Sequence, residues 1–178
     1  LWKARLASVA QRFVDGELTR RKTAVPTLFE TRGGSSFSDL DFKLTAEADR
    51  IDVDVDGRFH IYDYKTGALP SEKAQTYFDK QLLLETALAE MDGFGGLPPN
   101  QVARAIFIGL GGDRAEQKAP IETETPDKVW DEFYRLISVY SGENRGYTAR
   151  RALHMTTDVG DYDHLSRYGE WDMADEPN

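Results

Sequence analysis

Two aspartates and a lysine, Asp49, Asp63 and Lys65, are the residues of this chain whose types and spacing best suit a chemical reaction. Mg²⁺ prefers a few carboxylate ligands together with water molecules and the phosphate oxygens of a substrate. A nearby ammonium group can hold a water molecule or balance the charge that builds on phosphorus during cleavage. The three residues therefore predict magnesium-dependent cleavage of a phosphodiester, if the fold brings them together.

A predicted β-hairpin would bring these side chains together. Polar and apolar residues alternate over residues 50–55 and again over 58–64, with a turn at Asp56-Gly57 between them. In an antiparallel pair the start of one strand lies beside the end of the next, about 5 Å away, so Asp49 and Asp63 are expected side by side. The lysine lies two residues beyond Asp63 and therefore points to the same face.

Asp-x-Lys at a strand end is common by itself, but here it belongs to a longer ordered pattern. Ala-Asp-Arg-Ile-Asp at 48–52, Ile-Tyr-Asp-Tyr-Lys-Thr-Gly at 61–67 and Gln-Leu-Leu-Leu-Glu at 81–85 occur together in this order. This string resembles the RecB-type nuclease domain of the PD-(D/E)xK superfamily. The resemblance implies an α/β fold, namely a restriction-endonuclease-like mixed β-sheet flanked by helices, and a metal-dependent deoxyribonuclease site for Mg²⁺, in which Mn²⁺ can substitute.

The same resemblance assigns roles to four residues. It implies that Asp49 and Asp63 are metal ligands, that Lys65 is the catalytic lysine, and that Gln81 is the glutamine of the family's helix motif.

A second stretch narrows the resemblance. The segment Gly-Asp-Tyr-Asp-His-Leu-Ser-Arg-Tyr-Gly-Glu-Trp at 160–171 is similar to the C-terminal end of AddB-like subunits, and the likeness extends over about residues 15–172. It implies a cytoplasmic bacterial protein that acts on DNA during double-strand break end resection. Its implied partner is an AddA-like helicase–nuclease subunit.

Three features depart from the family pattern. Glu47 precedes the first aspartate by two residues, and strand alternation turns it to the same face as Asp49, which makes it a candidate third ligand. The family's upstream helix supplies a histidine ligand that has no counterpart here, and the chain opens at Leu1, so we expect a fragment of a longer protein that cleaves DNA poorly alone. The chain has no cysteine, which excludes the iron–sulfur cluster of some relatives.

The remaining pattern predicts the other elements. Tyr77, Gln81 and Glu85 would share one face of a helix over residues 71–91. The other predicted elements are a helix over 2 to about 20, a strand over 27–31, a loop at 33–36, a buried strand over 102–108, and a helix over 126–140 capped by Thr125.

Composition fits one nuclease-like domain over residues 1–178, in which 142–178 form a polar C-terminal extension. The 178 residues are 40% hydrophobic, and no apolar stretch approaches the roughly 18 residues of a membrane span. The net charge of −9 argues against a freestanding DNA binder, because Lys and Arg supply most nonspecific affinity for nucleic acid.

Three functions therefore remain open. The chain is an active nuclease domain, a catalytically inactive nuclease fold for DNA guiding or partner docking, or a metal-dependent hydrolase of small phosphates.

Overall fold

The computed structural model describes residues 2–111 and 114–142. It divides into two units, Leu1–Ile137 and Ser138–Asn178, and the sheet and its packed helices belong to the first. The predicted extension beyond Gly142, with the segment at 160–171, lies outside the described residues. Among the described helices, none is long and apolar enough to cross a membrane.

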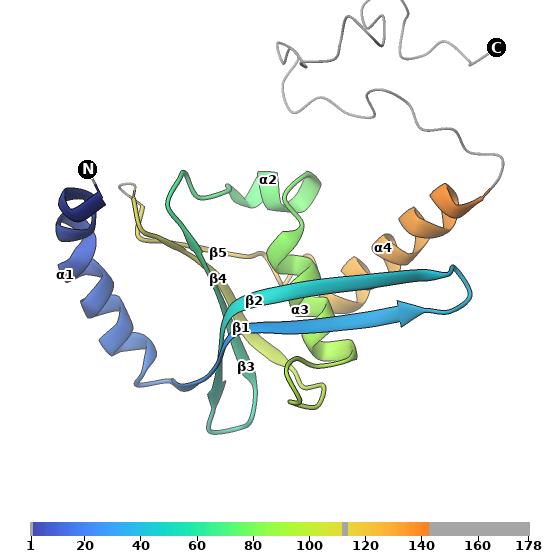
Figure 1. Ribbon diagram of the computed structural model, residues 1–178, viewed down its shortest axis with the longest axis horizontal. Coiled ribbons are helices and arrows are strands. Elements are labelled where there is room, and N and C mark those ends of the chain that lie inside the picture. Colours follow the sequence, from blue (N-terminus) through green and yellow to red (C-terminus); the bar gives the residue numbers. More distant parts are fainter. Residues whose placement is uncertain (1, 112–113, 143–178) are drawn as a thin grey trace, which may run out of the picture. The chain divides into compact units, whose positions relative to one another are not determined.

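A five-stranded mixed sheet forms the centre of the first unit (Figure 1). Its spatial order follows the chain: β1 (Ala24–Phe37), β2 (Phe42–Asp54), β3 (Phe59–Lys65), β4 (Val102–Gly109) and β5 (Glu116–Lys118). The pairs β1–β2, β2–β3 and β4–β5 are antiparallel, whereas β3–β4 is parallel. The predicted hairpin and buried strand are confirmed, while β5 was not predicted.

Helices flank both faces of this sheet, in agreement with the fold that the resemblance implies (Figure 1). On one face, α3 (Gln81–Met91) buries Leu82, Leu83 and Leu88 against Ile61 and Phe107. On the other face, α1 (Trp2–Arg20) packs Phe13 against a smaller cluster of Tyr62, Ile106 and Ile108. Residues that alternate along β3 therefore point alternately toward α3 and toward α1.

The predicted helix over 71–91 is wrong as a single element. It is divided into α2 (Glu72–Tyr77) and α3, because the N–H groups of Phe78 and Asp79 both donate to the Ala74 carbonyl at 2.8 Å. Ser71 caps α2, accepting from the Ala74 N–H at 3.1 Å. Tyr77 consequently lies on another helix than Gln81 and is exposed.

Separate anchors explain this break. Gln75 of α2 is buried, and its amide donates to the carbonyls of Pro70 and Lys118 at 3.3 Å each. Helix α3 is held by its leucines on the sheet, and Lys80 at its start bonds Glu124 at 2.9 Å. The bonds from Gln75 to Lys118 and from Lys80 to Glu124 are long-range, so they override a local helix preference.

The last described helix follows its prediction closely. Helix α4 (Pro126–Ser141) begins after Thr125, whose hydroxyl accepts from the Lys128 N–H at 3.4 Å. Val129 is buried and Trp130 packs against the core.

The predicted loop at 33–36 is also wrong, since these residues lie within β1. Gly33 pairs with Ala46, and Gly34 with Thr45. A Cβ added at Gly33 would lie 2.7 Å from the ring of buried Phe94. Glycine therefore admits an aromatic ring against the strand and does not mark a turn.

This packing predicts a large effect of one methyl group. Gly33→Ala should lower the free energy of unfolding by about 1–3 kcal/mol, because the buried Phe94 ring must move to accommodate it. Gly67→Ala is the matched control, since a Cβ there meets nothing within 4 Å and should change stability by less than about 1 kcal/mol. Chemical denaturation of both variants measures the difference, and equal midpoints would contradict this account.

Candidate functional site

The register of the β2–β3 hairpin sets the position of the two aspartates. Within the turn, Asp54 Oδ1 accepts the N–H groups of Asp56 and Arg58 at 3.0 and 2.9 Å, and Gly57 has φ 82°. The paired residues end with Arg50 opposite Tyr62. Continued by one residue, this register would place Asp49 opposite Asp63, the two neighbours that the sequence predicts.

Asp49 lies at the point where β2 stops pairing with β3. It is half-buried, and its Oδ2 accepts the backbone N–H of Tyr64 at 2.8 Å. This bond satisfies an N–H group of β3 that no longer faces a paired strand. The side chain is thereby fixed beside the end of β3.

Asp63 is the most buried of the predicted site residues, at 3% exposure. Its Oδ1 accepts Lys65 Nζ at 3.2 Å and Gln81 Nε2 at 2.8 Å. Its Oδ2 has an ion pair with Lys65 Nζ at 3.1 Å but no well-formed hydrogen bond within the described part of the chain. Burial raises the pKa of Asp63, and the charge of Asp49 adds to this effect, whereas Lys65 and Gln81 oppose it.

Lys65 and Gln81 close the arrangement around Asp63. Lys65 Nζ donates to Gln81 Oε1 at 3.0 Å and lies 5.4 Å from the centre of the Phe107 ring. Gln81 is the first residue of α3, so the break before that helix delivers it to the end of β3. The structure thus joins Asp63, Lys65 and Gln81 by direct bonds and sets Asp49 beside them.

Glu85 extends this cluster, although it was not predicted as a site residue. Its Oε1 accepts Gln81 Nε2 at 3.1 Å, whereas its Oε2 is buried without a hydrogen-bond partner among the described residues. Burial raises the pKa of Glu85 to about 7, and the charges of Asp63 and Asp49 contribute. The i,i+4 spacing to Gln81 was the available signal, but its burial at 3% exposure depends on the tertiary fold.

Glu47 does not join the two aspartates. Its carboxylate accepts Arg32 Nε at 2.9 Å, from the residue opposite it on β1, and its side chain is 46% exposed. It borders a hollow of ≈ 240 Å³ that Gln81 and Glu85 also line. Within residues 2–111 and 114–142, no group of three acidic, histidine or cysteine residues is close enough to hold a metal ion. The expectation of Glu47 as a third ligand is therefore wrong for this arrangement.

Two carboxylates nevertheless fit a hard divalent cation. Mg²⁺ is commonly held through one or two carboxylates, while water and substrate phosphates fill its other positions. Asp63 offers a buried oxygen that lacks a hydrogen bond, and Asp49 offers the oxygen that does not accept from Tyr64. These two residues would hold the ion, which would polarise a phosphoryl oxygen and favour an activated water.

Comparisons with known proteins identify the family. A family model described as the PD-(D/E)XK nuclease superfamily matches residues 1–158. An uncharacterized protein of Rickettsia felis is 28% identical over 166 residues, which cover 88% of this chain and 19% of that protein. Uncharacterized proteins of Rickettsia conorii and Rickettsia typhi are 30% and 29% identical over 52% and 53% of this chain, and 12% and 11% of their own lengths. The chain therefore spans about a fifth or less of these relatives.

The raised pKa of Glu85 predicts a pH-dependent gain in stability on neutralisation. A carboxyl group that binds its proton more tightly in the folded state does not lower the stability below pH 4.5, where it is protonated in both states. Between pH 4.5 and about pH 7 the loss of stability grows, and above that range it stays constant. Glu85→Gln should therefore be more stable than the parent chain above pH 7, by at most about 3 kcal/mol, with EDTA present. Thermal unfolding at pH 5 and pH 8 measures this difference, and an equal difference at both pH values would contradict it.

Proposed function

Since this chain belongs to the PD-(D/E)XK nuclease superfamily, we propose that it is a Mg²⁺-dependent deoxyribonuclease domain whose reaction centre is Asp49, Asp63, Lys65 and Gln81. Its mixed sheet with flanking helices is consistent with the restriction-endonuclease-like fold. The observation that carries the proposal is the bonded set of Asp63, Lys65 and Gln81 beside Asp49.

Each residue has a distinct task in this proposal. Asp49 and Asp63 supply the negative charge that attracts a divalent cation to the fork between β2 and β3. Lys65 brings a positive charge beside Asp63, where it stabilises negative charge developing on a phosphate. Gln81 donates to Asp63 and accepts from Lys65, so it fixes the orientation of both side chains.

The acidic net charge favours a supplied substrate over free capture. The net charge of −9 repels phosphates, and Glu85 adds a carboxyl behind Gln81. We therefore propose that the longer protein acts as an AddB-like subunit in double-strand break end resection. In this proposal an AddA-like helicase–nuclease partner delivers the DNA strand. The ordered motifs at 48–52, 61–67 and 81–85 and the segment at 160–171 support it.

Two substitutions separate the proposed centre from its surroundings. Asp63→Asn should reduce Mg²⁺-dependent cleavage of linear DNA by about a hundredfold or more in the full-length assembly, because the variant loses a ligand charge. Lys65→Ala should have an effect of similar size. Glu47→Gln is the control, because Glu47 is paired with Arg32 and should retain full activity. Gel assays of end-labelled DNA measure all three.

Other results would favour the remaining functions. Full activity of the Asp63→Asn assembly would contradict the proposed centre. Isothermal calorimetry with Mn²⁺ on the 178-residue chain distinguishes an inactive nuclease fold, which would show no Asp63-dependent binding. Hydrolysis of nucleotides but not of DNA would favour a small-phosphate hydrolase.

A further inference from the structure

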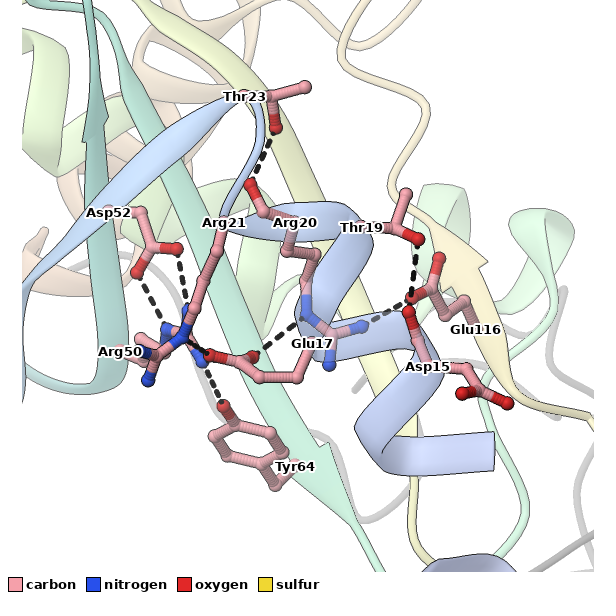
Figure 2. Close-up of polar contacts among 10 residues, drawn as sticks. All are labelled: Asp15, Glu17, Thr19, Arg20, Arg21, Thr23, Arg50, Asp52, Tyr64 and Glu116. Carbon is pink, nitrogen blue, oxygen red and sulfur yellow. Dashed lines mark hydrogen bonds and ion pairs between the residues drawn. The ribbon is translucent and has the colours of Figure 1, made fainter. Parts of the chain in front are cut away.

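We infer that Glu17 of α1 and Arg50 of β2 are positioning residues that hold Asp49 ready for a divalent cation, from the opposite face of the sheet. The inference rests on the proposed function, because it takes Asp49 to be a ligand. Glu17 and Arg50 both lie outside the bonded set around Asp63. Figure 2 shows their side chains between α1 and the sheet.

Arg50 is the centre of a charged network on the α1 face (Figure 2). Its guanidinium is buried and forms a bidentate pair with Asp52, at 2.6 Å from Nε to Oδ1 and 2.7 Å from Nη2 to Oδ2. Nη1 donates to Glu17 Oε2 at 2.7 Å and to the Tyr64 hydroxyl at 3.2 Å. A bidentate guanidinium pair is directional, so it fixes the plane of the Arg50 side chain.

Both sides of the Asp49 contact depend on Arg50. Asp49 is its sequence neighbour and, by strand alternation, points to the opposite face of the sheet. Tyr64 accepts a bond from Arg50 through its hydroxyl and donates one to Asp49 Oδ2 through its backbone N–H at 2.8 Å. Arg50 therefore restrains Tyr64, the donor of this bond, through the contact with its hydroxyl. It restrains Asp49, the acceptor, because the two residues are neighbours along the backbone.

Glu17 links this restraint to α1. Its side chain is 16% exposed and also accepts Arg21 Nε at 2.6 Å. Burial opposes its ionisation, but hydrogen bonds from Arg50 and Arg21 lower the pKa of Glu17 to about 2, so it is charged at neutral pH. A charged Glu17 attracts the Arg50 guanidinium toward the helix and orients its Nη1 between two acceptors.

A second ion pair provides a matched control. Arg20 Nη1 donates to Glu116 Oε1 of β5 at 2.6 Å, and this bond also fastens α1 to the sheet. Arg20 Nε lies 3.4 Å from Glu17 Oε2. Glu17→Gln and Glu116→Gln thus each neutralise one acidic partner of Arg20, but only the first alters the contacts of Arg50.

The test measures cation binding and stability separately on the 178-residue chain. Calorimetry with Mn²⁺ alone should show affinity about tenfold weaker for Glu17→Gln than for the parent chain, as for other outer-shell substitutions. Glu116→Gln should also lower the unfolding temperature yet bind Mn²⁺ as the parent does. Tyr64→Phe keeps the ring and removes one acceptor of Arg50, so it should also weaken binding.

The outcomes distinguish this inference from the proposed function. Parent-like Mn²⁺ affinity in both Glu17→Gln and Tyr64→Phe, with binding lost in Asp63→Asn, would refute the positioning role and leave the proposed function intact. Equal weakening in Glu17→Gln and Glu116→Gln would also refute it, because general destabilisation would then explain the loss. Absence of any Asp63-dependent binding in the parent chain would overturn both. If Glu17→Gln does not fold, Tyr64→Phe alone decides.

Discussion

The register between β2 and β3 is the constraint on which the rest of the structure depends. Because side chains alternate along a strand, a slip of one residue would move Arg50 to the α3 face and Asp49 to the α1 face. The carboxyl of Asp54, which accepts two turn N–H groups, holds this register at the closed end of the hairpin. At the open end, the Asp49–Tyr64 bond marks where pairing stops. The polar groups on both faces of the sheet follow from these two points.

The balance of buried charges differs between the two faces of the sheet. On the α1 face, Arg50 and Asp52 satisfy one another, and Glu17 completes the set. On the α3 face, negative charge exceeds positive charge: one lysine stands among Asp49, Asp63 and Glu85, and the pKa values of Asp63 and Glu85 rise. Unbalanced buried charge costs stability, and a bound cation would remove that cost. An excess of carboxyl groups on only one face is therefore typical of a binding site and unlike a structural ion pair.

The sequence pattern predicted the features that depend on residues close to one another along the chain. Alternation and a Gly turn are sufficient for the hairpin, and the hairpin is sufficient to set Asp49 beside Asp63. The motif likeness identified Gln81, whose contact with Asp63 crosses from helix to strand. The errors arose where distant residues intervene: the Phe94 ring packs against Gly33 within β1, and Arg32 pairs with Glu47. Gln75 and Lys80 hold two helices apart where one was expected, and the burial of Glu85 becomes visible only once α3 lies on the sheet.

The backbone bond to Asp49 has a consequence for ion selectivity. Its Oδ2 already accepts the Tyr64 N–H, so Oδ1 is the oxygen that a cation would approach without sharing a backbone hydrogen bond. Asp49 is thereby suited to monodentate coordination. Ca²⁺ takes six to eight oxygens and readily accepts bidentate carboxylates, whereas Mg²⁺ requires a compact octahedron with one oxygen from each ligand. If Asp49 holds the ion as proposed, this hydrogen bond at the fork of two strands would favour Mg²⁺ over the larger Ca²⁺.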